Sequence, residues 1–220
     1  EKDAIPPEFA ALQWLETLDL YMCQGLVAFP REVKRVKILT TLSIRSDKQS
    51  SIPLHIEFFP SLTKLSLWLE TLQEIPESVF AIEKLKKLSI TKGIFHFLSD
   101  LFGNLKHLEE FSISGNSLIK TFPQSIYSSR NLKRINIEDC PQFNHLDFSQ
   151  IEWMSLEFIG IHACGSLNAL PPNWGNLTSL RVLKLSGTPV AALPESLGGC
   201  AALEEIEITT GLTAPDAIPA

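Results

Sequence analysis

The chain has 220 residues, of which 45% are hydrophobic and 20% charged, a balance typical of a folded protein with a buried core. Its formal net charge of −6 and the absence of a basic arm argue against nucleic acid as a partner. No stretch approaches the roughly 18 consecutive apolar residues of a membrane-spanning helix, and the N-terminus lacks the basic and apolar regions of a signal peptide. We therefore expect no nucleic acid and no membrane among its partners.

The predicted elements, taken in chain order, repeat every 23 or 24 residues. Each repeat contains two apolar residues with one residue between them, preceded by apolar residues three and six positions earlier, with Ser129 as the one exception. The pairs are Leu18/Leu20, Leu42/Ile44, Leu65/Leu67, Leu88/Ile90, Phe111/Ile113, Ile135/Ile137, Ile159/Ile161, Leu183/Leu185 and Ile206/Ile208. An alternating pair of this kind predicts a short strand with one buried face.

A second pattern follows most of the predicted strands: an apolar residue, then Pro, then another apolar residue three positions further on. The prolines are Pro6, Pro30, Pro53, Pro76, Pro123, Pro171 and Pro194. Proline fixes φ and removes a backbone donor, which suits the start of a short helical turn and excludes a central strand. Each unit is therefore predicted to run from a strand through a turn to a short helical turn and back.

The segments "LEFIGIHACGSLNALPPNWGNL" (156–177) and "LTSLRVLKLSGTPVAALPESLGGC" (177–200) resemble leucine-rich repeats of the short Leu-Pro type. Such repeats occur in plant intracellular nucleotide-binding immune receptors, intracellular Ras-group repeat proteins and some bacterial effectors. The resemblance implies an α/β repeat solenoid, a leucine-rich repeat horseshoe with a parallel concave β-sheet and short helical or 3-10 turns on the convex side. Stacked units share one core in such a fold. We predict a single domain over residues 1–220, with about nine repeats and a partial one before the first.

The resembling family places Asn, Cys or Thr three residues after the second apolar residue of each strand, with the side chain turned inward. This chain has Cys23, Asn116, Cys140, Cys164 and Thr188 there, but Asp47, Glu70 and Gly93 in the second to fourth units. Three of the four cysteines are thus expected to be structural, and Cys200 takes the place of a core Leu. Four scattered cysteines do not form a disulfide scaffold, which favours a reducing, cytoplasmic location, in a host cell if the protein is a secreted effector.

Residues beside the buried pairs should face the concave side, because side chains alternate across a strand. The column that follows the pairs is Tyr21, Arg45, Trp68, Thr91, Ser114, Glu138, His162, Ser186 and Thr209. The column between the pair members contains four serines in a row: Ser43, Ser66, Ser89 and Ser112. The next column outward runs Met22, Ser46, Leu69, Lys92, Gly115, Asp139, Ala163, Gly187 and Thr210.

Arg45 is expected to stand between Tyr21 and Trp68 in cation–π contact, beside Met22 and Leu69. Trp, Tyr, Arg and Met concentrate binding energy at interfaces, so this cluster is a candidate docking site. The alternative is that Trp68 and Leu69 fold over an irregular edge and only shield the core.

Charged residues suggest two further parts of this face. Lys64 and Lys87, with Lys86 and Lys92 nearby, form a candidate basic patch, although an ordinary solvated surface is the alternative. Glu138 and its neighbours make the far half acidic, so a partner with an acidic and apolar segment suits the first half. The predicted partner-binding residues are Tyr21, Met22, Arg45, Lys64, Trp68, Leu69, Lys87, Lys92, Glu138 and His162.

Motifs for catalysis are missing from the sequence. It contains no phosphate-binding glycine loop, no Cys-x-x-Cys pair and no His-Glu-x-x-His. His162 with Cys140 or Cys164 resembles a dyad or metal pair, but the thiols should point inward and His162 outward. We therefore predict no enzyme activity, no metal and no cofactor.

The function predicted from these features is a protein–protein interaction module, monomeric as an isolated domain, that recognises a partner on the concave face. Two alternatives remain open. The first is the substrate-recognition region of a larger effector enzyme, such as a ubiquitin ligase. The second is an autoinhibitory or sensing region of an immune receptor.

Overall fold

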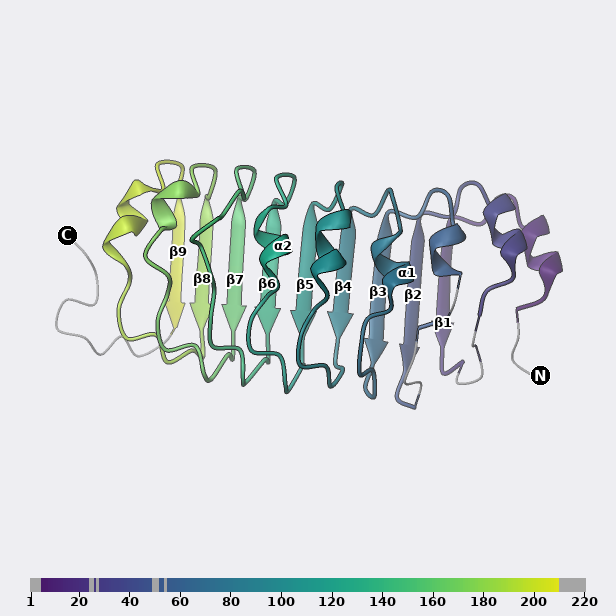
Figure 1. Cartoon of the computed structure of the whole chain (residues 1–220), viewed down its shortest axis with the longest axis horizontal. Helices are drawn as coiled ribbons and strands as arrows, with labels where there is room; N and C mark the ends of the chain where they lie inside the picture. Colours follow the sequence, from purple (N-terminus) through teal and green to yellow (C-terminus); the bar gives the residue numbers. More distant parts are fainter. Residues whose placement is uncertain (1–4, 24–25, 27, 49–51, 54, 210–220) are drawn as a thin grey trace.

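The computed structural model describes residues 5–23, 26, 28–48, 52–53 and 55–209. Nine parallel strands form one sheet in sequence order, as Figure 1 shows. The strands are β1 (Thr17–Tyr21), β2 (Thr41–Ser46), β3 (Lys64–Leu69), β4 (Lys87–Thr91), β5 (Glu110–Ser114), β6 (Arg134–Glu138), β7 (Phe158–His162), β8 (Val182–Ser186) and β9 (Glu205–Thr209). The predicted solenoid with a parallel sheet is confirmed, whereas Thr210 and both ends of the predicted domain lie outside the described residues.

The register of the sheet follows the sequence period. Leu18 lies beside Leu42, Leu42 beside Leu65, and the same step continues to Ile206 at the ninth strand. Residues at one position of the repeat therefore form straight columns across the sheet. The outward column that begins Tyr21, Arg45, Trp68 is thereby confirmed.

Short helical turns cover the opposite face of the sheet (Figure 1). They are η1 (Pro7–Ala11), η2 (Arg31–Arg35), η3 (Ile56–Phe58), α1 (Glu77–Phe80), η4 (Asp100–Asn104), α2 (Gln124–Tyr127), η5 (Trp174–Asn176) and η6 (Glu195–Gly199). A proline with extended backbone directly precedes five of them: Pro6, Pro30, Pro76, Pro123 and Pro194. The predicted role of proline is confirmed there, whereas Pro53 and Pro171 lie three residues before η3 and η5.

The core lies between the sheet and these turns and is rich in aromatic rings that meet edge-to-face or tilted. Phe80, Phe102, Phe111, Phe122 and Phe143 form one chain, with neighbouring centroids 4.9–6.0 Å apart. Such ring pairs add about 0.5–1.5 kcal/mol beyond their area burial. Trp153 and Trp174 are fully buried, as expected of residues that replace core apolar positions.

The ends of the strands differ between units. In six units the residue after the outward column has a left-handed backbone: Met22, Lys92, Gly115, Asp139, Ala163 and Gly187. This bend turns the next side chain inward, so Asn116, Cys140, Cys164 and Thr188 are buried, as the resemblance implied. Asn116 Oδ1 accepts hydrogen bonds from the backbone N–H of Leu118 at 3.0 Å and of Ile119 at 2.7 Å.

Strands β2 and β3 have no such bend and continue one residue further. Ser46 and Leu69 end these strands and are each 1% exposed, while Asp47 and Glu70 lie on the surface. The expectation that Leu69 faces a partner is therefore wrong. In an extended strand its side chain points to the opposite face from Trp68, and that face is the core.

Candidate functional site

Arg45, Tyr21 and Trp68 form a stack at the ends of three adjacent strands. The Arg45 Cζ atom lies 3.3 Å from the centroid of the Trp68 ring and 5.4 Å from that of Tyr21. Tyr21 is 64% exposed, whereas Trp68 is half-buried. The sheet register brings these residues side by side, and the predicted cation–π contacts are confirmed. We call these three residues the arginine stack.

The surroundings of the arginine stack are mixed in charge. A small hollow of about 110 Å³ beside it is lined by Tyr21, Met22, Arg45, Ser46, Asp47, Trp68 and Glu70. Met22 is exposed at its rim, and its backbone N–H donates to the Arg45 carbonyl at 2.8 Å. The edge of the stack therefore offers an apolar surface together with the carboxylates of Asp47 and Glu70, which follow β2 and β3.

A larger hollow of about 490 Å³ lies over the strand residues that precede and separate the buried pairs. Ser66, Ser89 and Ser112 form its floor, and Ser112 Oγ lies 2.9 Å from Ser89 Oγ in a hydrogen bond. Its polar edge consists of Lys64, Lys87, Glu110 and Arg134, and Phe158 stands at its far end. We call this hollow the serine trough.

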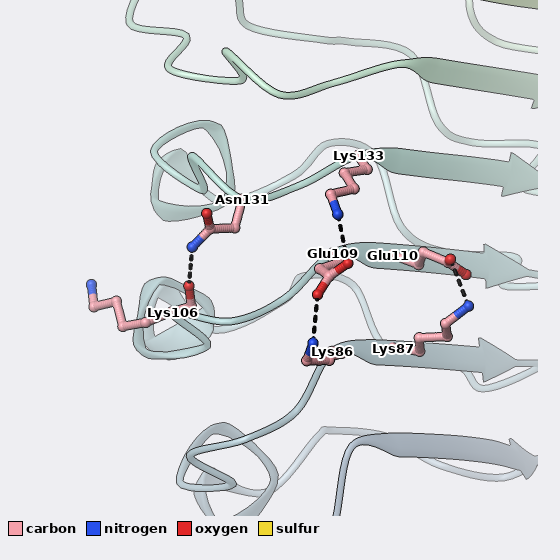
Figure 2. A network of polar contacts seen from close by, with 7 residues as sticks. All are labelled: Lys86, Lys87, Lys106, Glu109, Glu110, Asn131 and Lys133. Atoms are coloured by element: carbon pink, nitrogen blue, oxygen red, sulfur yellow. Dashed lines mark hydrogen bonds and ion pairs between the residues drawn. The ribbon is translucent and has the colours of Figure 1, made fainter.

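Ion pairs neutralise two of the four lysines of the predicted basic patch, Lys86 and Lys87. Lys87 Nζ lies 2.6 Å from Glu110, and Glu109 bridges Lys86 and Lys133 at 2.9 Å each (Figure 2). Lys133 and then Lys86 lower the pKa of Glu109 to about 2, because both ammonium groups favour the carboxylate. Of the predicted patch, Lys64 remains exposed on β3 with no ion pair among the described residues. The patch is therefore smaller than the sequence suggests.

Lys92 lies apart from the serine trough. It follows β4, has a left-handed backbone with φ of 70° and donates its N–H to the Ser114 carbonyl at 2.7 Å. Its aliphatic chain runs past Gly115, where an added Cβ would lie 3.1 Å from Lys92 Cδ. Lys92 is exposed directly after the carboxyl end of β4 and does not extend the basic edge formed by Lys64.

Arg134 and Phe158 were not predicted as site residues from the sequence. The Arg134 Cζ atom lies 4.1 Å from the centroid of the Phe158 ring, and the two residues close one end of the serine trough. Gly160 permits this arrangement, because an added Cβ would lie 3.0 Å from the ring and collide with Asn136 Oδ1. Gly160 takes the position between the buried pair that is serine in β2 to β5. Phe158 takes the position before the pair, which is charged in β3 to β6. These two departures are the sequence signal that could have revealed the arrangement.

Glu138 and His162 lie further along the sheet, around a separate hollow of about 210 Å³. His162 Nδ1 shares a hydrogen bond with Ser186 Oγ on the next strand. Lys184 pairs with Glu205 and with Glu207, both at 2.8 Å, so the acidic half is also partly neutralised. These residues are several strands away from the arginine stack.

The buried thiols lie on the opposite face of the sheet from the imidazole of His162, although Cys164 Sγ contacts the His162 backbone carbonyl at 3.5 Å. Cys140 and Cys164 are free and fully buried, and burial raises their pKa values to about 11 and about 12. His162 is exposed on the opposite face of the sheet, as predicted. Among the described residues, no three His, Cys, Asp or Glu side chains are grouped so that they could hold a metal ion.

Two exposed apolar residues outside the columns were also missed. Phe97 is 76% exposed, and Ile94, three residues before it, is also exposed, both in the loop after β4. Phe95 and Leu98 fill the buried positions of the same loop. The segment "GIFHFLSD" therefore has more apolar residues than the repeat can bury, which is the signal that could have identified this surface.

Comparisons with known proteins give relatives in sequence and in fold. No protein-family profile matches the chain. It is 27% identical over 200 residues to TMV resistance protein N of Nicotiana glutinosa, which covers 88% of this chain and 17% of that protein. It is 30% identical over 142 residues to the disease resistance-like protein DSC1 of Arabidopsis thaliana, covering 61% of this chain and 11% of that protein. The chain thus corresponds to less than a fifth of each of these relatives.

Among solved structures, the leucine-rich repeat domain of the type III effector XopL superimposes with a TM-score of 0.74. That match covers 94% of this chain and 72% of the other, at 20% sequence identity. The chain has the leucine-rich repeat fold. InlJ of Listeria monocytogenes is similar as well, with a TM-score of 0.64 at 16% identity over 93% of this chain and 42% of that one.

Over the described residues, no helix reaches the length and apolar character needed to cross a membrane.

Proposed function

We propose that this leucine-rich repeat chain is a protein-recognition module that binds a partner protein on the concave face. The arginine stack is the observation that supports this proposal most strongly. Three residue types that dominate interface energetics converge on one exposed site, although they come from three different repeats.

The geometry of the stack favours binding because the side chains are already ordered. Immobilising a flexible side chain at an interface costs about 0.5–1.5 kcal/mol. Arg45 is held against Trp68 before any partner arrives, so this part of the cost is already met in the free protein. A partner that covers the stack gains buried aromatic area at a small entropic cost.

Of the two alternatives, the relatives favour a sensing region of an immune receptor. Similarity to a tobacco resistance protein extends over 88% of this chain. Similarity to XopL, at 20% identity, concerns the fold alone. The free thiols agree with a reducing, cytoplasmic compartment. We therefore prefer a sensing role over substrate recognition for a ubiquitin ligase.

We propose that the module itself performs no catalysis. The His162–Ser186 hydrogen bond is the arrangement closest to a nucleophile with its base. Within the described residues no carboxylate is bonded to His162, so the group that orients the base in a triad is missing there. The buried, high-pKa thiols are also poor nucleophiles.

Site-specific photo-crosslinking tests the proposed face. A photoreactive amino acid at Tyr21 should capture a partner in a plant extract, whereas the same group at exposed Glu77 of the convex helix α1 should not. Trp68→Ala should weaken that interaction about 30-fold, the effect of losing a hot spot of about 2 kcal/mol. The matched control is Trp14→Ala, because Trp14 is 90% exposed outside the sheet. Capture from position 77 alone, or equal effects of both Trp variants, would rule out this face.

A further inference from the structure

We propose that the serine trough binds an extended acidic segment of the partner, with two carboxylates four residues apart held by Lys64 and Arg134. This inference rests on the proposed function, since it names the kind of segment that the concave face accepts. It concerns residues beside the arginine stack, and it is tested separately from the stack.

Charge is the first argument. The chain has a net charge of −6, yet Lys64 and Arg134 have no carboxylate within ion-pair distance among the described residues. Other cations near the trough are paired, namely Lys86, Lys87 and Lys133. Two free positive charges thus remain on the edge of a hollow in an otherwise acidic protein. An anionic ligand would complete the pairing that the rest of the surface already has.

Spacing is the second argument. Lys64 begins β3 and Arg134 begins β6, so three strand spacings, about 14 Å, separate their backbones. An extended chain advances about 3.4 Å per residue and presents alternate side chains to the same face. Positions i and i+4 of such a chain are therefore also about 14 Å apart and point the same way. A segment laid across the strands places one carboxylate near each cation.

The floor of the trough fits what lies between those two carboxylates. Ser66, Ser89 and Ser112 are small and leave room for a backbone. The hydroxyls of Ser66 and Ser89 can donate to peptide carbonyls, whereas Ser112 already donates to Ser89. The Lys87–Glu110 pair occupies the middle of the edge and has no net charge. Position i+2 of the segment should therefore be small or neutral.

Arg134 is also oriented for a carboxylate. Its guanidinium lies over the Phe158 ring, which fixes the plane of the group while leaving its N–H edge available. A guanidinium held in one plane forms a bidentate pair with a carboxylate at lower entropic cost than a mobile one. Phe158 further closes the end of the trough, so the segment must end there or turn away from the sheet.

The test is selection of random nonapeptides displayed on phage against the 220-residue chain. We expect the retained peptides to be enriched in Asp or Glu at positions i and i+4, with retention that falls as salt rises from 0.05 M to 0.5 M. The Lys64→Glu/Arg134→Glu variant should retain them about tenfold less or worse. Both residues are exposed, so the variant should fold, which circular dichroism checks.

A matched double reversal controls for net charge. Arg35→Glu/Lys106→Glu changes the total charge by the same amount at exposed residues outside the trough, and Figure 2 shows the Lys106 side chain apart from the ion pairs. This control should retain the peptides as the wild type does. Equal losses in both double variants would overturn the acidic-segment proposal.

The outcomes also separate this inference from the proposed function. If the retained peptides lack the acidic spacing and are lost with Trp68→Ala, the concave face binds protein but the acidic segment is wrong. If no retained peptide responds to Trp68→Ala or to the Lys64/Arg134 reversal, both proposals fail. Acidic peptides lost only with the Lys64/Arg134 reversal support the inference directly.

Discussion

Two parts of this sheet end their strands in different ways. In β5 to β8 a left-handed residue follows each strand and the next side chain enters the core. In β2 and β3 the strand runs one residue further, and Ser46 and Leu69 enter the core instead. The outward column stays in register in both parts. The comparison teaches that the core contact can move by one residue while the concave surface keeps its geometry.

The largest difference should appear when Asp is placed at the same repeat position in each of the two parts. Leu69→Asp places a carboxyl group in the core and should lower the free energy of unfolding by about 4 kcal/mol. Gly187→Asp changes the equivalent position of β8 and should cost about 1 kcal/mol or less, because Asp tolerates a left-handed backbone. Urea denaturation of both variants measures the difference. Similar losses would mean that the two strand ends are equivalent.

The inward residue of a regular unit should come next in size. Asn116→Ala removes the acceptor of one buried and one partly buried backbone N–H group and should cost about 3 kcal/mol. Asp47→Ala, at the equivalent but exposed position of the second unit, should change stability by less than about 0.5 kcal/mol. Thermal unfolding followed by circular dichroism compares the two. A large effect at Asp47 would contradict the described shift.

The ion pairs of Glu109, which lies directly before β5, should make the stability of the regular part depend on pH. The pKa of Glu109 is lowered from 4.5 to about 2, so its ion pairs stabilise the fold above about pH 4.5 and lose this contribution as pH falls toward 2. Because the pairs are partly exposed, Glu109→Gln should cost only about 1 kcal/mol at pH 7 and nothing near pH 2. Unfolding curves from pH 2 to 7 test this, with exposed Glu83→Gln as the control.

The smallest effects should have opposite signs in the two parts. Ala163 has φ of 52°, so Ala163→Gly relieves an unfavourable backbone and should stabilise the protein by about 0.5–1 kcal/mol. Ser46→Gly, in the extended end of β2, should destabilise it by a similar amount. Chemical denaturation resolves both changes. Destabilisation in both variants would show that residue 163 gains more from its side chain than it loses in backbone strain.

Much of the fold could be predicted because the repeat is written directly in the spacing of apolar residues. Leu18, Leu42 and Leu65 lie beside one another in the sheet, so counting along the sequence gave the strand register. The Tyr21–Arg45–Trp68 contacts followed from that register and from side-chain alternation. The position of the first buried residue in each repeat was enough to predict these contacts.

The remaining features depend on contacts that spacing does not encode. The sequence does not say whether Leu69 continues a strand or follows a bend, because both conformations are allowed for a leucine until packing selects one. Similarly, Glu110 forms an ion pair with Lys87, while Arg134 lies over Phe158. Lys87 and Arg134 compete for the same carboxylate, and the period of the sequence does not decide between them. Such competitions are decided by three-dimensional distances and not by the period.

The unstaggered register described for the nine strands also bears on how this surface can change in evolution. A strand is added without shifting the positions of its neighbours, since each strand pairs only with those next to it in sequence. Duplication of one 23- or 24-residue unit within the gene would lengthen the concave face by about 4.8 Å while preserving every existing column. Loss of a unit would shorten it by the same step. A change in repeat number could thus fit the face to a binding segment one or two residues longer or shorter, while the side chains of the existing repeats stay the same.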